Sequence, residues 1–278
     1  MDPLSGNSEA SQTHTKLGAG PGEIAMYRIL ASLAPACNDH FATLLLPAAI
    51  TIDPSRGLLV LPHYDGDDLA ARWSETDGGA LLATGMAASI AAILADLARI
   101  DTACVTADPV LSKIPGLAFD HAAALTRSAG IARMLTRAGL LSREGCARAE
   151  QLLAHHQCTP MIVNNGDFYP RNLIMLPGGR IVIVDWETYN ANSPFHTIDH
   201  PENVAAVFYV HMWGNPAWQA AYRGALNERY AFSQTSFAKG VVIQALELAN
   251  MWMNDTDLHL AAIQASIVTS MLANTRHR

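Results

Sequence analysis

The alternation of hydrophobic and polar positions divides the first half of the chain into a short mixed segment and a long helical one. Apolar residues recur at helical spacing after Glu23 and predict a short helix there. Two β-like runs follow, over residues 42–52 and 57–64, and the Asp-Pro-Ser-Arg between them predicts a hairpin turn. Residues 69–156 are helical in pattern and rich in alanine.

The second half begins with a compact β-like region and then returns to helix. A short strand is predicted over residues 161–163, followed by a polar loop up to residue 172. Two further strands, over residues 173–176 and 180–184, are joined by Pro-Gly-Gly, which predicts a tight turn. The remaining pattern predicts four helices, over residues 202–213, 216–229, 237–253 and 258–273.

The polar Asp-Gly-Asp-Asp at residues 65–68 suggests a boundary between two lobes. We therefore expect residues 1–20 to be disordered or a linker, residues 21–66 to form a reduced N-terminal lobe, and residues 67–278 to form a mainly helical C-terminal lobe. A small β-containing lobe followed by a mainly helical one is an α+β fold.

Composition limits the classes of function. Of the 278 residues, 50% are hydrophobic and only 15% are charged, which predicts a large buried core and excludes disorder of the whole chain. Against 25 Asp and Glu stand 18 Lys and Arg, so the net charge of −7 disfavours nucleic acid as a partner and would suit a cationic one. The uncharged stretch 78–95 is expected to be a core helix rather than a membrane span, because no Lys or Arg lies beside either end.

Cellular location is inferred from the first residues and from the cysteines. Residues 1–16 lack the basic start and apolar core of a secretory signal. The four cysteines form no C-x-x-C pair, so we expect free thiols and neither a disulfide framework nor a zinc site. The expectation is a cytoplasmic protein that does not bind membranes.

The segment with the most specific chemistry is Asn-Gly-Asp-Phe-Tyr-Pro-Arg-Asn, which contains Asp167 and Asn172, followed after a predicted hairpin by Asp185. The spacing D-x-x-x-x-N with a later acidic residue is that of the catalytic loop of kinases. Phosphoryl transfer to a hydroxyl requires a carboxylate to accept the proton and hard oxygen ligands to hold Mg²⁺. The competing interpretation is that these residues only form turns.

These motifs resemble those of the aminoglycoside phosphotransferase and choline kinase superfamily, namely H-G-D-x-x-x-x-N and a later hydrophobic-I-D-W-E. The resemblance implies a two-lobed protein-kinase-like fold and ATP-dependent phosphorylation of a small-molecule hydroxyl. It implies that Asp167 is the catalytic base and that Asn172 and Asp185 are Mg²⁺ ligands. Asn165 replaces the family's histidine and is expected to support the loop by hydrogen bonding in the same way.

The same resemblance assigns residues to nucleotide binding. It implies that Glu23 pairs with Lys16, which would hold the α and β phosphates, and that Pro62, His63 and Tyr64 lie beside the adenine. For Lys16 the competing interpretation is an exposed linker lysine, because its segment shows no β pattern. For Glu23 the competing interpretation is an acidic residue in the first turn of a helix, where the helix dipole favours it. His63 is expected to be a surface residue.

One departure from the family lies at the N-terminus. Only fifteen residues precede Lys16, and they contain no β-like run, so we expect the phosphate-covering hairpin to be missing. The Gly-Ala-Gly-Pro-Gly at residues 18–22 fits a flexible linker better than a phosphate loop. This leaves an alternative function, a catalytically impaired homologue that binds a metabolite or a partner.

The motifs do not determine the acceptor. The excess of acidic residues is compatible with a cationic small molecule, and neutral sugars or alcohols are the alternative. The aromatic residues Phe208, Tyr209, Trp213 and Trp218 lie at helical spacings and are expected in the core. They would line a substrate pocket if their helices cover the Asp167 loop.

Overall fold

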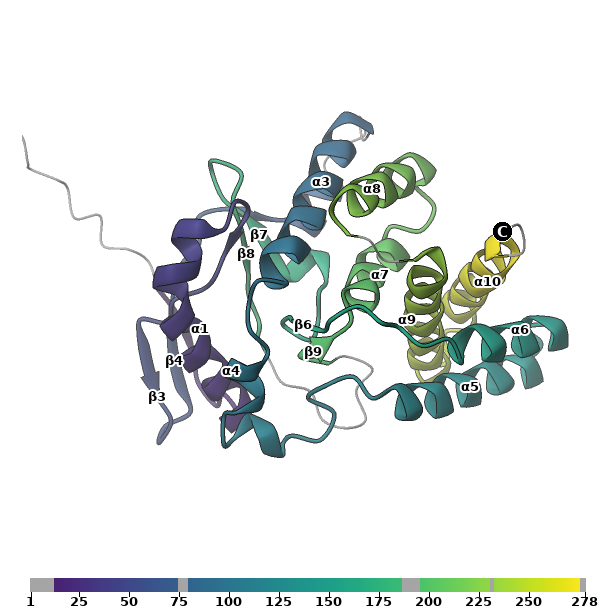
Figure 1. Cartoon of the computed structure of the whole chain (residues 1–278), viewed down its shortest axis with the longest axis horizontal. Helices are drawn as coiled ribbons and strands as arrows, with labels where there is room; N and C mark the ends of the chain where they lie inside the picture. The colour runs from purple at the N-terminus through teal and green to yellow at the C-terminus, as the bar shows by residue number, and fades with distance from the viewer. Residues whose placement is uncertain (1–12, 75–79, 187–195, 231–232, 276–278) are drawn as a thin grey trace, which may run out of the picture.

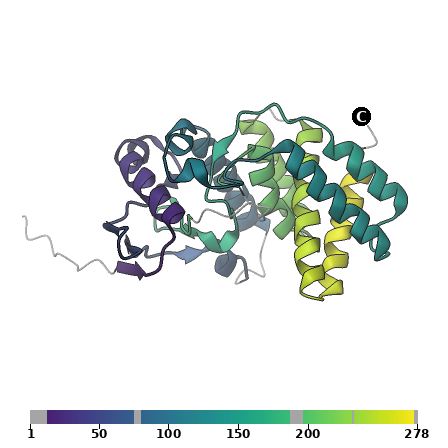
Figure 2. The same cartoon turned by 90° about the horizontal axis from the view of Figure 1, so that it is seen from below.

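The computed structural model describes residues 13–74, 80–186, 196–230 and 233–275. The N-terminal part carries one helix and a three-stranded antiparallel sheet, and the rest of the chain is dominated by helices (Figure 1). A view from below shows the helices α5, α6, α9 and α10 gathered at the end of the molecule remote from the N-terminal strands (Figure 2). The expected α+β fold with a mainly helical C-terminal part is confirmed.

The N-terminal sheet has the order β1-β4-β3, formed by Thr13–Lys16, Leu58–Pro62 and Thr51–Asp53. The predicted hairpin is therefore confirmed for β3 and β4, which pair antiparallel with Asp53 opposite Leu58. The expected linker is wrong at residues 13–16, because they pair along the free edge of β4. Residues 1–12 lie outside the described part of the chain.

The predicted strand over residues 42–52 is divided in two. Its first part forms β2 (Leu44–Leu45), which pairs parallel with β8 (Ile181–Ile183) rather than with residues 57–64. Pro47 lies between the two parts and has no N–H to donate to a ladder, so one continuous strand is not possible there.

A four-stranded sheet in the order β2-β8-β7-β5 connects the two lobes. The hairpin β7 (Leu173–Met175) and β8 is the one predicted from Pro-Gly-Gly. At its other edge, β5 (Asp67–Asp68) pairs antiparallel with β7, although these acidic residues were predicted only as a boundary. Gly66 allows this approach, since a Cβ at that position would collide with the carbonyl oxygen of Met175.

The helices lie close to their predicted ranges. Helix α1 (Pro21–His40) begins with a proline in its first turn, and α3 (Ala80–Leu97) covers most of the uncharged stretch, as expected for a core helix. In the described part of the chain, no helix meets the length and hydropathy needed to cross a bilayer. The other helices are α2 (Leu69–Ser74), α4 (Ala103–Thr106), α5 (His121–Arg137), α6 (Arg143–Leu153), α7 (Pro201–His211), α8 (Pro216–Arg229), α9 (Gln234–Asn254) and α10 (Leu258–Asn274).

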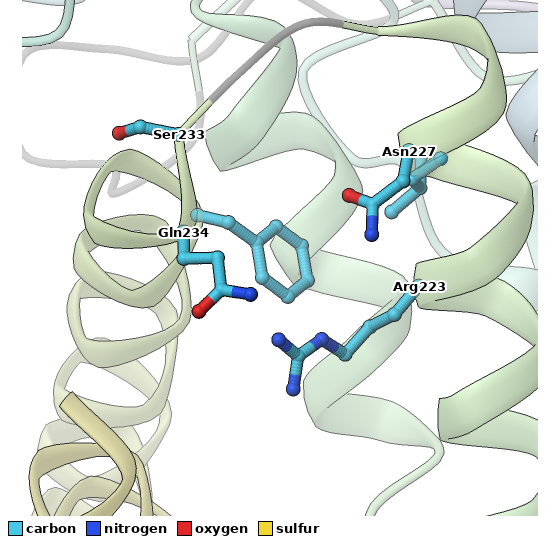
Figure 3. A pocket seen from close by; sticks show the side chains of 6 residues that line it. Arg223, Asn227, Ser233 and Gln234 are labelled. Atoms are coloured by element: carbon cyan, nitrogen blue, oxygen red, sulfur yellow. The ribbon is translucent and has the colours of Figure 1, made fainter. Parts of the chain in front are cut away.

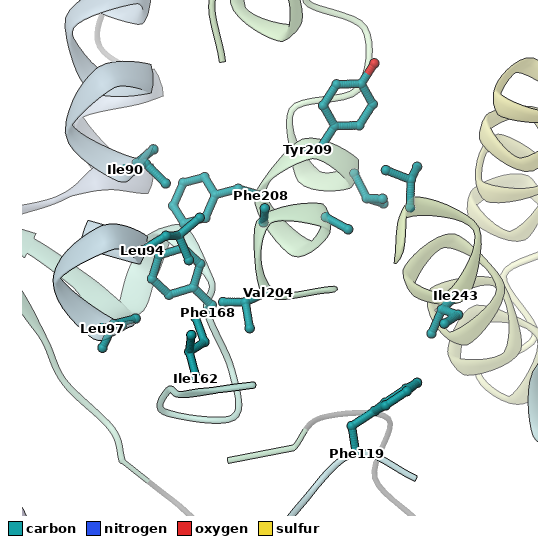
Figure 4. Close-up of a cluster of buried hydrophobic side chains, with 14 of the residues drawn as sticks. Ile90, Leu94, Leu97, Phe119, Ile162, Phe168, Val204, Phe208, Tyr209 and Ile243 are labelled. Atoms are coloured by element: carbon teal, nitrogen blue, oxygen red, sulfur yellow. The ribbon is translucent and has the colours of Figure 1, made fainter. Parts of the chain in front are cut away.

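The hydrophobic core supports the segment that carries the predicted chemistry. Phe168, in the Asp167 loop, is buried and packs edge-on against Phe208 of α7, with ring centroids 5.2 Å apart. Figure 4 shows both rings beside Ile90 and Leu94 of α3. A buried aromatic ring anchored between two helices fixes the backbone on either side of it.

Candidate active site

The Asp167 loop, residues 164–172, is held by buried asparagine side chains at its start. Asn164 accepts a hydrogen bond from Gly166 N at 2.7 Å and donates to His196 O at 3.0 Å. Asn165 donates to Asp167 O at 2.9 Å and to Val184 O at 3.2 Å. Asn165 therefore ties the loop to the residue before Asp185, which is the support expected of the residue that replaces the family's histidine.

Asn172 connects the end of the loop back to Asp167. Its Nδ2 donates to Asp167 O at 3.0 Å and to Asp167 Oδ2 at 3.1 Å. The backbone of the same residue is joined to the β8 end, because Val184 N donates to Asn172 O at 2.9 Å. Asp167, Asn172 and Asp185, predicted from a spacing along the sequence, are therefore neighbours in the fold.

Asp185 follows β8 in an unusual backbone conformation. Its φ is +59°, the left-handed region that costs a residue with a side chain about 1 kcal/mol or more. The next residue, Trp186, is fully buried, and its Nε1 donates to Ile183 O at 2.7 Å, which fixes the turn from the other side. This conformation leaves the Asp185 side chain 44% exposed at the cleft rather than in the core.

Lys16 lies between two carboxylates. Its Nζ is 2.8 Å from Glu23 Oε1 and 3.4 Å from Asp185 Oδ1. The Glu23 side chain is 7% exposed and that of Lys16 is 30% exposed, so the pair is mostly shielded from water. The interpretation of Lys16 as a linker lysine is wrong, because pairing of β1 with β4 carries it to the start of α1 and to the end of β8.

These residues line one large cleft of about 780 Å³ between the N-terminal sheet and the hairpin β7–β8. Seven of the eight predicted site residues line it, namely Lys16, Glu23, Pro62, His63, Tyr64, Asn172 and Asp185. Asp167 is the exception: it is bonded to Asn172 at the edge of the cleft. A cleft of this size falls in the range that holds a drug-sized ligand.

Two tyrosines give the cleft part of its apolar wall. Burial raises the pKa of Tyr64 to about 12, against the opposing effect of a hydrogen bond with the backbone of Ala48. Burial also raises the pKa of Tyr27 above its usual value, and the nearby Glu23 and Asp185 carboxylates act in the same direction. Both side chains are therefore uncharged at neutral pH.

Several lining residues were not predicted from the sequence. Tyr27 stands one helical turn after Glu23, so the i+4 spacing on α1 is a signal that was available for it. Arg171 lies inside the predicted loop and contributes a positive charge to the cleft. Gly66 and Asp68 offered no signal, because only the pairing of β5 with β7 carries them there.

The donor set fits Mg²⁺. The Nδ2 of Asn172 is bonded to Asp167, which leaves its Oδ1 as an acceptor, and Asn172 and Asp185 line the same cleft. Within the described residues no three His, Cys, Asp or Glu side chains form a group able to hold a metal. In proteins, Mg²⁺ is usually held by one or two side-chain oxygens together with phosphate oxygens and water.

A second hollow is too small for a substrate. It lies between α8 and the start of α9, where Arg223, Asn227, Ser233 and Gln234 surround it (Figure 3). Its volume of about 10 Å³ is close to that of one water position.

Comparison with known proteins identifies the fold. No family model and no curated protein matches the sequence. Among solved structures, the chain matches a choline/ethanolamine kinase family protein from Mesorhizobium loti with a TM-score of 0.59 and 14% identity, over 97% of this chain and 88% of that one. A thermostable mutant of an aminoglycoside phosphotransferase matches with a TM-score of 0.55 and 15% identity, over 99% and 94% of the two chains.

A spectinomycin phosphotransferase, solved with ADP and spectinomycin, matches with a TM-score of 0.57 and 10% identity, over 95% of this chain and 87% of that one. The resemblance to this superfamily is confirmed at the level of the fold. Because the alignments cover nearly the whole of each chain, the similarity includes both lobes.

Proposed function

Because this chain has the fold of the small-molecule kinases, we propose that it transfers the γ-phosphoryl group of ATP to a hydroxyl of a small molecule. The observation that carries the proposal is the position of Lys16, bonded to Glu23 and beside Asp185 in the wall of the large cleft. Lys16 and Glu23 are near one another in the sequence, whereas Asp185 comes from a remote segment. A purely structural ion pair would not require this third charged partner open to a cleft.

Lys16 is proposed to bind the α and β phosphates, and Glu23 holds its ammonium in place. Pro62, His63 and Tyr64 lie at the end of β4 and are proposed to face the adenine. Asn172 and Asp185 would hold Mg²⁺, which neutralises charge on the phosphates and stabilises the developing negative charge of the transition state.

Asp167 is proposed to orient the acceptor and to accept its proton. The acceptor oxygen attacks the γ-phosphorus, the bond from this phosphorus to the β–γ bridging oxygen breaks, and the hydroxyl proton passes to a carboxylate oxygen of Asp167. The hydrogen bond from Asn172 Nδ2 to Asp167 Oδ2 restrains the orientation of the carboxylate. A base held in position by a neighbouring group contributes on the order of 10²–10⁴-fold in rate.

The first experiment is isothermal titration of the 278-residue chain with ATP and with GTP, each with and without Mg²⁺. Mg²⁺-dependent nucleotide binding that is lost in Asp185→Ala and retained in Asp101→Ala would support the proposal. Asp101 is the control because its carboxylate lies on an exposed turn and does not line the cleft. Absence of nucleotide binding in the unmodified protein would refute it.

The role of Asp167 needs a second measurement. Asp167→Ala should abolish phosphoryl transfer and leave nucleotide affinity within about twofold, since Asp167 does not line the cleft. An equal loss of binding in Asp167→Ala and Asp185→Ala would contradict the assigned roles. Nucleotide binding without transfer to any acceptor in a broad panel would instead support the alternative, a catalytically impaired homologue.

A further inference from the structure

Another pocket, which we call the apolar pocket, adjoins the Asp167 loop at Tyr169 and Pro170. Its volume is about 170 Å³. It is lined by segments from α2, α3, the loop and α7, of which the residues used below are Ala70, Tyr169, Phe208 and His211. Among the residues that the structure describes, eight line the pocket, and none of these is acidic, a lysine or an arginine.

Two stretches of chain run along both the cleft and the apolar pocket. In the first, Gly66 and Asp68 line the cleft, while the next two residues, Leu69 and Ala70, line the apolar pocket. In the second, Arg171 and Asn172 line the cleft, and the two residues before them line the apolar pocket. The two hollows therefore share a wall, and that wall is the Asp167 loop with the β5–α2 segment.

Asp167 is connected to both sides of this wall. Its Oδ2 accepts from Asn172 Nδ2, which faces the cleft. Its backbone oxygen accepts from Tyr169 N at 2.7 Å, a tight turn that keeps Tyr169 of the apolar pocket next to it. A group that passes a proton during transfer between a donor and an acceptor belongs at such a boundary.

The lining of the apolar pocket is uncharged. His211 Nδ1 lies 2.7 Å from Val207 O, so Nδ1 carries the proton and Nε2 is an acceptor. Burial lowers the pKa of His211, which keeps the ring neutral at physiological pH. Tyr169 packs edge-on against the His211 ring with centroids 4.3 Å apart, and Phe208 is engaged by Phe168 on the core side (Figure 4).

We propose that the apolar pocket holds the body of the acceptor, and that the acceptor is a neutral alcohol with a compact apolar body about the size of a six-membered ring. This inference rests on the proposed kinase function and specifies its substrate class. An apolar cavity of about 150 Å³ is known to admit benzene, so 170 Å³ suits a ring of that size. A polycationic acceptor would have to place its charges against described lining residues, none of which is a carboxylate that could compensate their loss of water.

The test uses 4-fluorobenzyl alcohol, an uncharged ring that carries one hydroxyl and reports its binding by ¹⁹F NMR. The blocking variant is Ala70→Phe, which adds a ring at the pocket wall. The matched control is Ala71→Phe, the same change at the next residue of α2, which is exposed and does not line the pocket. ATP titration is run on all three proteins.

The expected result is that the probe binds to the unmodified protein and to Ala71→Phe, and at least tenfold more weakly to Ala70→Phe. ATP affinity should stay within twofold in all three, and the unmodified protein should phosphorylate benzyl alcohol faster than choline. Equal probe binding in the two variants, or faster phosphorylation of choline, would overturn the inference. If ATP still bound in that case, the proposed function would not be refuted. Absence of ATP binding in the unmodified protein would refute the proposed function. In that case the comparison of Ala70→Phe with Ala71→Phe would still show whether the probe binds in the apolar pocket.

Discussion

Asp96 on α3 should be among the residues most important for stability, because it joins the two lobes beneath the site. Its carboxylate is 5% exposed, and Oδ2 accepts from Thr43 N and Leu44 N, each at 3.0 Å. These two N–H groups lie at the start of β2, the strand that pairs with β8 ahead of Asp185. Asp96→Ala therefore leaves two backbone donors in the interior without their acceptor.

The magnitude follows from these contacts. Hydrogen bonds to a charged group contribute about 1.5–3 kcal/mol each, so losing both in Asp96→Ala should lower the free energy of unfolding by about 3–6 kcal/mol. The entropy of unfolding is about 0.6 kcal/mol per kelvin for a chain of this length, which converts the loss to a fall in Tm of about 5–10 °C. Asp96→Asn keeps an oxygen acceptor and loses only the charge, so about half of that effect is expected.

Urea denaturation and thermal melting of the three proteins measure this directly. The control is Asp101→Ala, which removes a single exposed hydrogen bond to Ala103 N and should cost about 1 kcal/mol or less. If Asp96→Ala were no more destabilising than Asp101→Ala, the two bonds to β2 would not hold the lobes together as argued. A result in which Asp96→Asn is as damaging as Asp96→Ala would assign the effect to the charge alone.

Three further predictions concern the cleft, the buried acids and the helix packing. Lys16→Met should weaken ATP binding about 10- to 100-fold in titration calorimetry, because a charge-assisted hydrogen bond to phosphate contributes about 1.5–3 kcal/mol. Burial raises the pKa of Asp199 from 3.8 to about 7, so between these pH values Asp199 is protonated in the native state and ionised in the unfolded state. The stability that this proton binding contributes is therefore lost as the pH rises from about 4 to about 7. The unmodified protein should therefore lose stability as the pH rises from 5 to 8, whereas Asp199→Asn should not. In urea denaturation, the free energy of unfolding of Asp199→Asn relative to the unmodified protein should increase by about 1–3 kcal/mol over this range. Gly240→Ala should destabilise by about 1–3 kcal/mol in the same assay, because a Cβ there would lie 2.7 Å from Glu202 O, a backbone atom of α7 that packs against α9.

Two of these predictions have a matched control variant in the same chain. For Lys16 it is Lys113→Met, an exposed residue at the end of a short 3-10 helix, and equal ATP affinity in the two variants would contradict the assigned role. For Asp199, a stability difference that does not change with pH would show that the carboxyl does not titrate in this range. For Gly240 it is Gly224→Ala on α8, where a Cβ meets nothing within 4 Å and alanine should stabilise the helix by about 0.5–1 kcal/mol; a gain at both positions would refute the packing argument.

Features that depend on neighbouring residues could be predicted from the sequence alone. Pro-Gly-Gly between two apolar runs predicts the hairpin β7–β8, and the range 216–229 predicted for α8 is the observed one, with Asn215 as its N-cap. That Asp167, Asn172 and Asp185 are neighbours could also be predicted from their spacing, because a short loop followed by a tight hairpin brings the chain back to the same place. Turn residues and helix caps act over a few positions, so they can be recognised in a single sequence.

Which distant segments meet could be seen only in the folded chain. Lys16 lies in a four-residue strand with no alternating pattern, and its role depends on the free edge of β4, more than forty residues away. Likewise Leu44 and Leu45 were predicted to continue into a hairpin, and the open edge of β8 draws them into the other sheet. The apolar pocket combines four segments whose individual residues are ordinary core types. Strand pairing and cavity shape depend on how well remote surfaces fit one another, and this fit leaves no signal in the residues of either segment alone.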